Sequence, residues 1–303
     1  MVRIAAAAWP VTWHDDWASY EAKLTAWVAE AAGQGAELLV FPEYGLMELA
    51  SLGGAEVAAD LEGALREVAR HTPAADALHA RLAAAHGVHV LAGSGPVYDG
   101  PRPVNRATLF GPEGRIGHQD KQMMTRFEAE EWDVVPGGPL TVFDTALGRL
   151  GVLICYDCEF PLLARALVEA GADILLAPSC TETVAGFTRV RVGSMARALE
   201  NQCVVVHAPL LGEAEWCAGV EVNRGRAAIY GPPDRGWPET GILAETAMDA
   251  PGWAIAEVSH AAITEVRRDG GVLNHRDWPA HVARAQVGPA ATKALKKRPA
   301  GAI

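Results

Sequence analysis

The sequence contains no uninterrupted apolar run as long as the roughly 18 residues that a membrane-spanning helix requires. We also expect no secretory signal, because Met1 to Ile4 lead directly into an alternating apolar stretch without a basic segment and a cleavage site. We therefore expect a soluble, cytoplasmic protein that does not bind membranes.

Positive charge is scarce. The chain has 26 Lys and Arg against 37 Asp and Glu, which gives a net charge of -11. Such a balance repels the phosphates of nucleic acids and of anionic membranes. The expected partner is therefore a small molecule and not a nucleic acid.

Cysteine is scarce as well, with five residues in a chain of 303. The number is odd, and a chain of this length that is 50% hydrophobic can build a large core without disulfides. We expect free thiols in a reducing compartment, most of them buried as small apolar residues.

Short runs rich in Val, Leu and Ile alternate with longer stretches of helical period, a pattern that predicts an α/β protein. Strands are predicted at Ile4–Ala8, Glu37–Phe41, His89–Ala92, Ala107–Phe110, Arg115–His118, Leu140–Phe143, Leu150–Ile154, Ile174–Ala177, Cys203–His207, Ala227–Tyr230 and Ala254–Val258. Helices are predicted from about Tyr20 to Ala31 and near Leu61–Ala85, Pro161–Ala170 and Arg189–Gln202.

The segment from Asn105 to Phe143 has successive short strands with little room for helices, which indicates antiparallel pairing and a mixed sheet. No Pro/Gly/Ser-rich linker divides the chain. We predict one domain over residues 1–271 and a C-terminal tail over residues 272–303, whose basic run from Lys293 to Arg298 is expected to be solvated and partly disordered.

Three reactive side chains, Glu43, Lys121 and Cys155, each follow a predicted strand. Because ligand sites of α/β proteins gather at the carboxyl ends of strands, the three are expected to converge on one cleft. A thiol needs a base to take its proton or a cation to favour the thiolate, and Glu43 and Lys121 supply both.

The residues around these side chains resemble the signatures of the nitrilase superfamily of carbon–nitrogen hydrolases. The matching stretches are Phe41-Pro42-Glu43, His118-Gln119-Asp120-Lys121 and Gly151-Val152-Leu153-Ile154-Cys155-Tyr156-Asp157, and the resemblance extends from Arg3 to about Val258. It implies a four-layer αββα sandwich with two mixed sheets, assembled as a homodimer or larger oligomer through the helix layers.

The resemblance also implies roles for these residues. Cys155 is the nucleophile, Glu43 the general base, and Lys121 stabilises the developing oxyanion, together with the backbone N–H of Tyr156. A second glutamate that orients the lysine is assigned to Glu130 by counting back from Pro136-Gly137, with Glu131 and Glu128 as competitors. This chemistry requires no metal or organic cofactor.

Other residues near the motifs are candidates for the substrate pocket. Cys158 is either a pocket wall or a packed core residue, and the C-x-x-C that it forms with Cys155 has no second Cys/His pair to make a zinc site. Thr181 and Glu182 are expected at the pocket from their strand-end position, with a surface loop as the competing interpretation. Glu159 stands where relatives acting on α-keto acid amides carry Arg, which disfavours an acidic substrate.

These observations predict an amidase that releases ammonia from a small neutral or amine-bearing amide. A nitrilase or an N-carbamoyl hydrolase would use the same three residues and remains an alternative. A catalytically silent binding or scaffold protein on the same fold is a more distant one, because the three reactive residues are intact.

Overall fold

The computed structural model describes residues 1–286, 288 and 293. Its first β-sheet is built around β1 (Val2–Pro10), β2 (Leu38–Val40) and β3 (His89–Leu91), which run parallel. Antiparallel strands extend it on both sides, and these are β14 (Gly252–Val258) on β1, and β5 (Val104–Gly111), β4 (Gly95–Val97) and β6 (Gly114–Asp120) beyond β3.

The second sheet is also mixed. Its parallel strands are β8 (Gly148–Val152), β9 (Ile174–Ser179) and β10 (Val204–Glu213). The antiparallel strands are β7 (Val142–Thr145), β12 (Ala228–Tyr230), β13 (Ile242–Glu245) and the short β11 (Val222–Asn223). The two sheets meet where the end of β1 pairs with β10, at Trp9 with Leu210 and Pro10 with Leu211.

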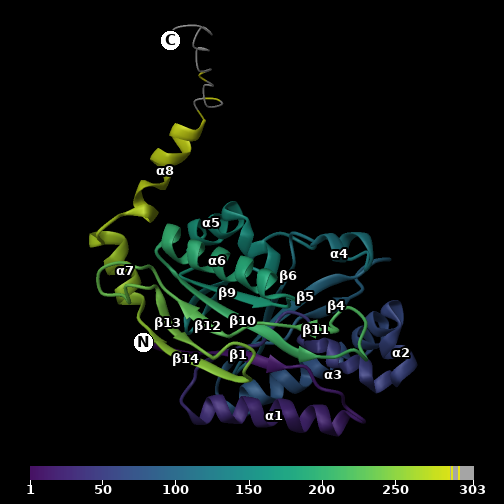
Figure 1. The fold of residues 1–303 in the computed structure, drawn as a ribbon. Helices are drawn as coiled ribbons and strands as arrows, with labels where there is room; N and C mark the ends of the chain where they lie inside the picture. The colour runs from purple at the N-terminus through teal and green to yellow at the C-terminus, as the bar shows by residue number, and fades with distance from the viewer. Residues whose placement is uncertain (287, 289–292, 294–303) are drawn as a thin grey trace, which may run out of the picture.

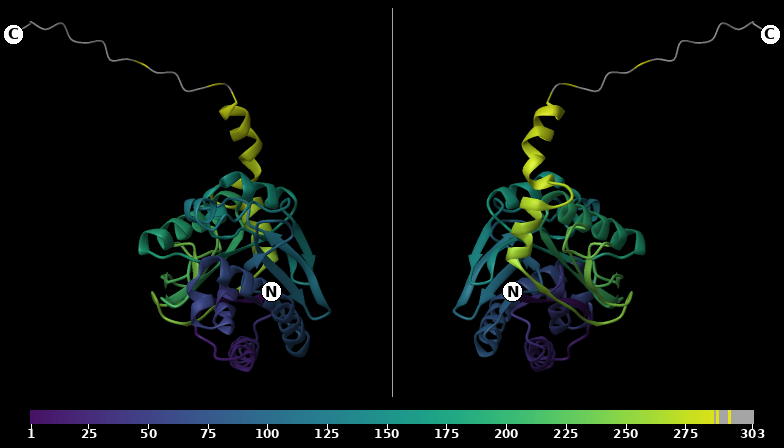
Figure 2. Two further views of the ribbon diagram at one scale, coloured as in Figure 1. Left: turned by 90° about the vertical axis from the view of Figure 1, so that its right-hand side faces the viewer. Right: turned by 90° about the vertical axis from the view of Figure 1, so that its left-hand side faces the viewer.

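Helices cover the outer face of each sheet, so the molecule has four layers (Figures 1 and 2). α1 (Trp17–Gly33) and α3 (Leu61–His86) lie on the first sheet, and α5 (Pro161–Glu169) and α6 (Val184–Asn201) lie on the second. The remaining helices are η1 (Gly45–Gly53), α2 (Ala55–Ala59), α4 (Arg126–Glu130), η2 (Cys155–Glu159), α7 (His260–Asp269) and α8 (Asn274–Ala285).

The alternation of side chains along the strands produces these layers. In β1, Ile4, Ala6 and Ala8 belong to the core between the two sheets, while Ala5 and Ala7 face the core shared with α1 and α3. The same division occurs in β9, where alternate residues face the inter-sheet core and the core under α5 and α6. This confirms the predicted four-layer αββα sandwich.

Every predicted strand is present, with ends shifted by a few residues, and β4, β11 and β13 are additional short strands. The helix predicted at Arg189–Gln202 begins earlier, at Val184, because the Thr183 side chain caps it by accepting from the Gly186 N–H.

The predicted tail contains α8, which has no buried residue and projects from the layers in Figures 1 and 2. Apart from Lys293, its basic run lies outside the described residues. Among the helices of the described part of the chain, none has the length and apolarity needed to cross a bilayer.

Candidate active site

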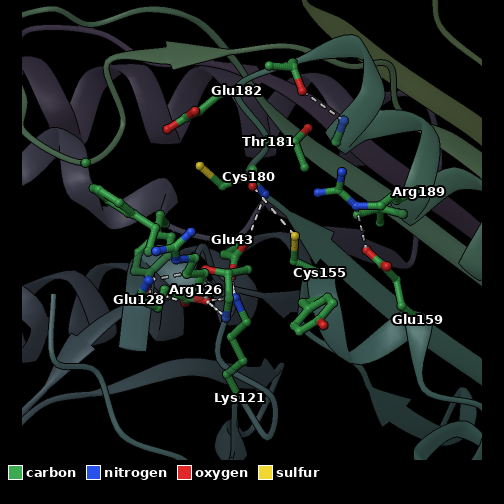
Figure 3. Close-up of a pocket in the computed structure, with 18 of the residues that line it drawn as sticks. Glu43, Lys121, Arg126, Glu128, Cys155, Glu159, Cys180, Thr181, Glu182 and Arg189 are labelled. Atoms are coloured by element: carbon green, nitrogen blue, oxygen red, sulfur yellow. Dashed lines mark hydrogen bonds and ion pairs between the residues drawn. The ribbon is translucent and has the colours of Figure 1, made fainter. Parts of the chain in front are cut away.

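Both sheets contribute to one pocket of about 310 Å³ (Figure 3). Glu43 follows β2 and Lys121 follows β6 of the first sheet, whereas Cys155 begins η2 after β8 of the second sheet. All three side chains line the pocket, so the structure brings together the three residues that the sequence motifs single out.

The Lys121 ammonium lies between two buried carboxylates. Its Nζ donates to Glu43 Oε1 at 2.7 Å and to Glu128 Oε2 at 2.5 Å, and its side chain is 1% exposed. Burial alone would lower the pKa of Lys121, but the charges of Glu128 and Glu43 raise it well above its ordinary value. Lys121 is therefore a fixed cation at neutral pH.

Glu43 is held by two further donors. Asn105 Nδ2 donates to Oε1 at 3.0 Å, and the backbone N–H of Cys180 donates to Oε2 at 2.9 Å. Burial raises the pKa of Glu43 to about 7, although the Lys121 ammonium opposes this effect. A carboxyl group with such a pKa can take and return a proton near neutral pH.

Cys155 has a left-handed backbone, with φ of 51°, at the first residue of η2. Its thiol is buried and donates to the Cys180 carbonyl oxygen at 3.6 Å. Burial and the Glu43 carboxylate raise the pKa of the thiol well above its ordinary value, despite the Lys121 ammonium. The thiol is thus protonated at neutral pH, and a base is needed to form the thiolate.

The buried carboxylate of Asp157 connects η2, which begins at Cys155, to the loop that follows Lys121. It accepts from the backbone N–H groups of Ile154 at 3.0 Å, Gln122 at 3.2 Å and Met123 at 2.8 Å. Burial raises the pKa of Asp157 to about 6. These hydrogen bonds fix the position of Lys121 relative to Cys155.

The second glutamate beside Lys121 is Glu128, which corrects the prediction of Glu130. Glu128 is the third residue of α4 and forms a capping box with Thr125, while the Tyr44 hydroxyl donates to its Oε1 at 2.7 Å. Lys121 lowers the pKa of Glu128, although burial opposes this. Glu130 lies on the surface and pairs with Arg126 at 2.7 Å, because the short helix turns it away from the pocket.

Four of the predicted substrate-binding residues, Tyr156, Glu159, Thr181 and Glu182, line the pocket. Cys158 does not, which corrects its assignment. It is fully buried, packs in the core under α5 and α6, and donates its thiol hydrogen to the Leu153 carbonyl oxygen at 3.5 Å.

Several residues that line the pocket were not predicted from the sequence. Tyr44, Phe127 and Trp132 form an aromatic wall, with ring centroids 4.8 Å apart for Tyr44 and Trp132. Gly219 closes against this wall, since a Cβ there would lie 1.7 Å from Trp132. Arg189 of α6 also lines the pocket and pairs with Glu159 at 3.3 Å.

Comparisons with known proteins agree with this geometry. The family model for carbon–nitrogen hydrolases matches residues 3–268. The probable hydrolase YhcX of Bacillus subtilis is 32% identical over 214 residues, which are 71% of this chain but only 42% of YhcX. A deaminated glutathione amidase of Synechocystis sp. is 30% identical over 270 residues, which are 81% of this chain and 88% of that protein.

The fold is similar to that of the NitN amidase of Nesterenkonia sp. AN1, with a TM-score of 0.67 at 24% identity over 95% of this chain and 100% of that one. The family model and the nearly full-length relative identify the chain: it belongs to the carbon–nitrogen hydrolase family.

Proposed function

We propose that this protein is an amidase that converts a small neutral or amine-bearing amide to a carboxylic acid and ammonia through a thioester on Cys155. The observation that carries the proposal is the position of the Lys121 ammonium, which contacts the carboxylates of Glu43 and Glu128 in the pocket that also holds the Cys155 thiol. Base, cation and nucleophile are thus all present in one buried site.

In the acylation step, ionised Glu43 takes the proton of the Cys155 thiol as the sulfur attacks the amide carbon. The negative charge that develops on the amide oxygen is stabilised by the Lys121 ammonium and the backbone N–H of Tyr156. The proton on Glu43 then passes to the amide nitrogen, the carbon–nitrogen bond breaks, and ammonia leaves.

In the second step, Glu43 takes a proton from a water molecule that attacks the thioester carbon. The thioester collapses to a carboxylic acid, and the proton returns to the Cys155 sulfur. Glu128 acts through Lys121, because its carboxylate and that of Glu43 hold the ammonium in place.

The names of related proteins support an amide over a nitrile substrate. Relatives are named deaminated glutathione amidase and omega-amidase. Structures of the Nesterenkonia amidase include a complex with acrylamide and the covalent addition of the acetamide moiety of fluoroacetamide at its active-site cysteine. In that enzyme a small amide thus reaches the active-site cysteine, as the substrate does in the mechanism that we propose for Cys155.

The charges of the pocket support a substrate that is not a simple anion. Four carboxylates and three cations line it, and these are Glu43, Glu128, Glu159 and Glu182 with Lys121, Arg126 and Arg189. With every group ionised, the lining carries one excess negative charge. A carboxylate on the substrate is then unfavourable unless a positive charge accompanies it.

We further propose that the enzyme forms a homodimer or larger oligomer through the outer face of α5 and α6. Leu162 on α5 and Val192 and Leu199 on α6 are 71%, 60% and 44% exposed. Exposed apolar side chains gathered on one face favour association. Sedimentation of the wild type and of Leu162→Glu tests this, and a wild-type protein that remains a monomer contradicts it.

The test of the amidase function is ammonia release from a panel of neutral, cationic and acidic amides, nitriles and N-carbamoyl compounds, with Cys155→Ala as the control. Activity on an amide that is absent from the variant supports the proposal. Equal release by both proteins contradicts the nucleophile, whereas hydrolysis of nitriles or N-carbamoyl compounds alone contradicts the amidase function.

A further inference from the structure

The wall of the pocket beside Cys155 carries an ion pair that the proposed chemistry does not use. Glu159 is the last residue of η2, the turn that begins at Cys155, and Arg189 comes from α6. Arg189 Nε donates to Glu159 Oε1 at 3.3 Å, and both side chains line the pocket. Figure 3 shows them on the side of Cys155 opposite Lys121 and Glu128.

This pair is held loosely. The Arg189 side chain is 63% exposed and that of Glu159 is 24% exposed. An exposed ion pair contributes little to stability, so each of the two side chains can leave its partner and bind a ligand charge at little cost. A guanidinium has five N–H donors, and Nε uses one of them here. Figure 3 shows the terminal nitrogens of Arg189 directed toward Thr181, over the space above Cys155.

The other charged groups of the pocket are engaged differently. Lys121 is bound by Glu43 and Glu128, and Arg126 is held by Glu130, which does not line the pocket. Glu182 is exposed on another side of the opening. Glu159 and Arg189 therefore form an ion pair within the pocket lining that is separate from Glu43, Lys121 and Glu128.

A substrate with one charge at its far end matches only half of this pair. A carboxylate alone would bind Arg189 but would face Glu159 without a counter-charge, and an ammonium alone would leave Arg189 without its partner. A far end that carries both charges gives each residue an opposite charge and keeps the substrate neutral overall.

We propose that Glu159 and Arg189 select amides whose far end is a dipolar ion, which makes the substrate class the ω-amide of an α-amino acid. Glu159 binds the α-ammonium and Arg189 binds the α-carboxylate, while the side-chain amide reaches Cys155. This inference rests on the proposed function, because it takes the Cys155 pocket as the place where the amide binds.

Four amides of one chain length separate the two charges. Glutamine carries both, 4-aminobutanamide only the ammonium, glutaric acid monoamide only the carboxylate, and butanamide neither; asparagine adds a shorter chain. We expect kcat/KM for an amino-acid amide to exceed that for butanamide by about tenfold or more, the effect of one charge-assisted contact.

Two variants assign the contacts. Glu159→Gln should reduce the advantage of substrates that carry an ammonium, and Arg189→Gln that of substrates that carry a carboxylate, each by about tenfold. Arg191→Gln is the matched control, since Arg191 is also on α6 but pairs with Glu245 at 2.8 Å and does not line the pocket. It should keep the wild-type ratios.

The binding of the same compounds to Cys155→Ala, measured by calorimetry, separates the two proposals. Hydrolysis of butanamide without preference for glutamine or asparagine, or unchanged ratios in both charge variants, overturns the dipolar-ion inference and leaves the amidase function intact. If the wild type hydrolyses no amide, the amidase function fails. The inference then stands only if Cys155→Ala binds an amino-acid amide and if adding Glu159→Gln or Arg189→Gln to Cys155→Ala weakens that binding.

Discussion

Glu43 and Glu48 stand close together in the chain, both are buried, and each binds a lysine ammonium. Glu43 binds Lys121 in the pocket, whereas Glu48, within η1, binds Lys23 of α1. Glu48 also accepts from Trp9 Nε1 at 3.0 Å and from the Thr12 N–H at 2.9 Å. With His14 as a further partner, Glu48 has four hydrogen-bond partners, whereas Glu43 has three.

The two lysines differ in how many carboxylates they meet. Burial lowers the pKa of Lys23, although Glu48 opposes this, whereas the two carboxylates beside Lys121 raise its pKa well above the ordinary value. A buried Glu–Lys pair is therefore not in itself a catalytic site. A second carboxylate, a thiol and a pocket distinguish Lys121 from Lys23, and the following substitutions test that distinction.

The largest effect is expected for Lys121→Met. In the proposed mechanism the Lys121 ammonium stabilises the oxyanion, so its loss should lower kcat/KM by about a thousandfold. Steady-state ammonia release, with circular dichroism to confirm folding, measures this. A folded variant that keeps activity within a factor of about ten would contradict the role of Lys121.

Glu128→Gln should have the next largest effect, with kcat/KM lowered by about a hundredfold. The amide cannot match the charge of the carboxylate that receives the Lys121 hydrogen bond at 2.5 Å, so the ammonium loses its fixed position. Glu130→Gln is the matched control and should retain activity, because Glu130 is exposed and pairs with Arg126 at the surface. The reverse order of the two variants would restore Glu130 as the second glutamate.

Lys23→Met should affect stability and not catalysis. The substitution leaves Glu48 buried with His14, Trp9 and the Thr12 N–H as its remaining donors, so we expect the free energy of unfolding to fall by about 2 kcal/mol. Urea unfolding measures this loss, and kcat/KM of the folded protein should equal that of the wild type. A large loss of activity without a loss of stability would make the two clusters equivalent.

Much of this arrangement could be predicted from the sequence. Glu43, Lys121 and Cys155 each follow a predicted strand, and strand ends converge in α/β folds. The three missed strands have two to four residues each, which is too short to show a clear alternating pattern. Their existence depends on neighbouring strands rather than on their own residues.

The errors at the site have specific causes. Counting from Pro136-Gly137 led to Glu130, but Thr125-Arg126-Phe127-Glu128 is a capping-box pattern that identifies Glu128 as the residue folded back toward the helix start. Cys158 is buried because η2 turns it under α6, where Arg197 Nη1 donates to its carbonyl oxygen at 3.0 Å. Arg189 and Glu159 belong to helices that are 30 residues apart in the chain, so their pairing has no local signal in the sequence.

The smallest effect concerns the pH dependence of the base. Because the pKa of Glu43 is about 7 and the proposed mechanism requires its carboxylate to take the thiol proton, kcat/KM should fall as the pH drops through 7. Asn105 Nδ2 donates to Glu43 Oε1 from a side chain that is 1% exposed, and this hydrogen bond favours the ionised form. Asn105→Leu removes the donor at similar volume, so the acidic limb of the pH profile should move to higher pH while activity well above the limb is largely kept.

A matched Asn201→Leu substitution, in which the lost hydrogen bond goes to Arg197, should leave the limb in place. An acidic limb that is identical in the wild type and in Asn105→Leu would mean that another group controls it, and Asp157, with its pKa of about 6, would then be the residue to test.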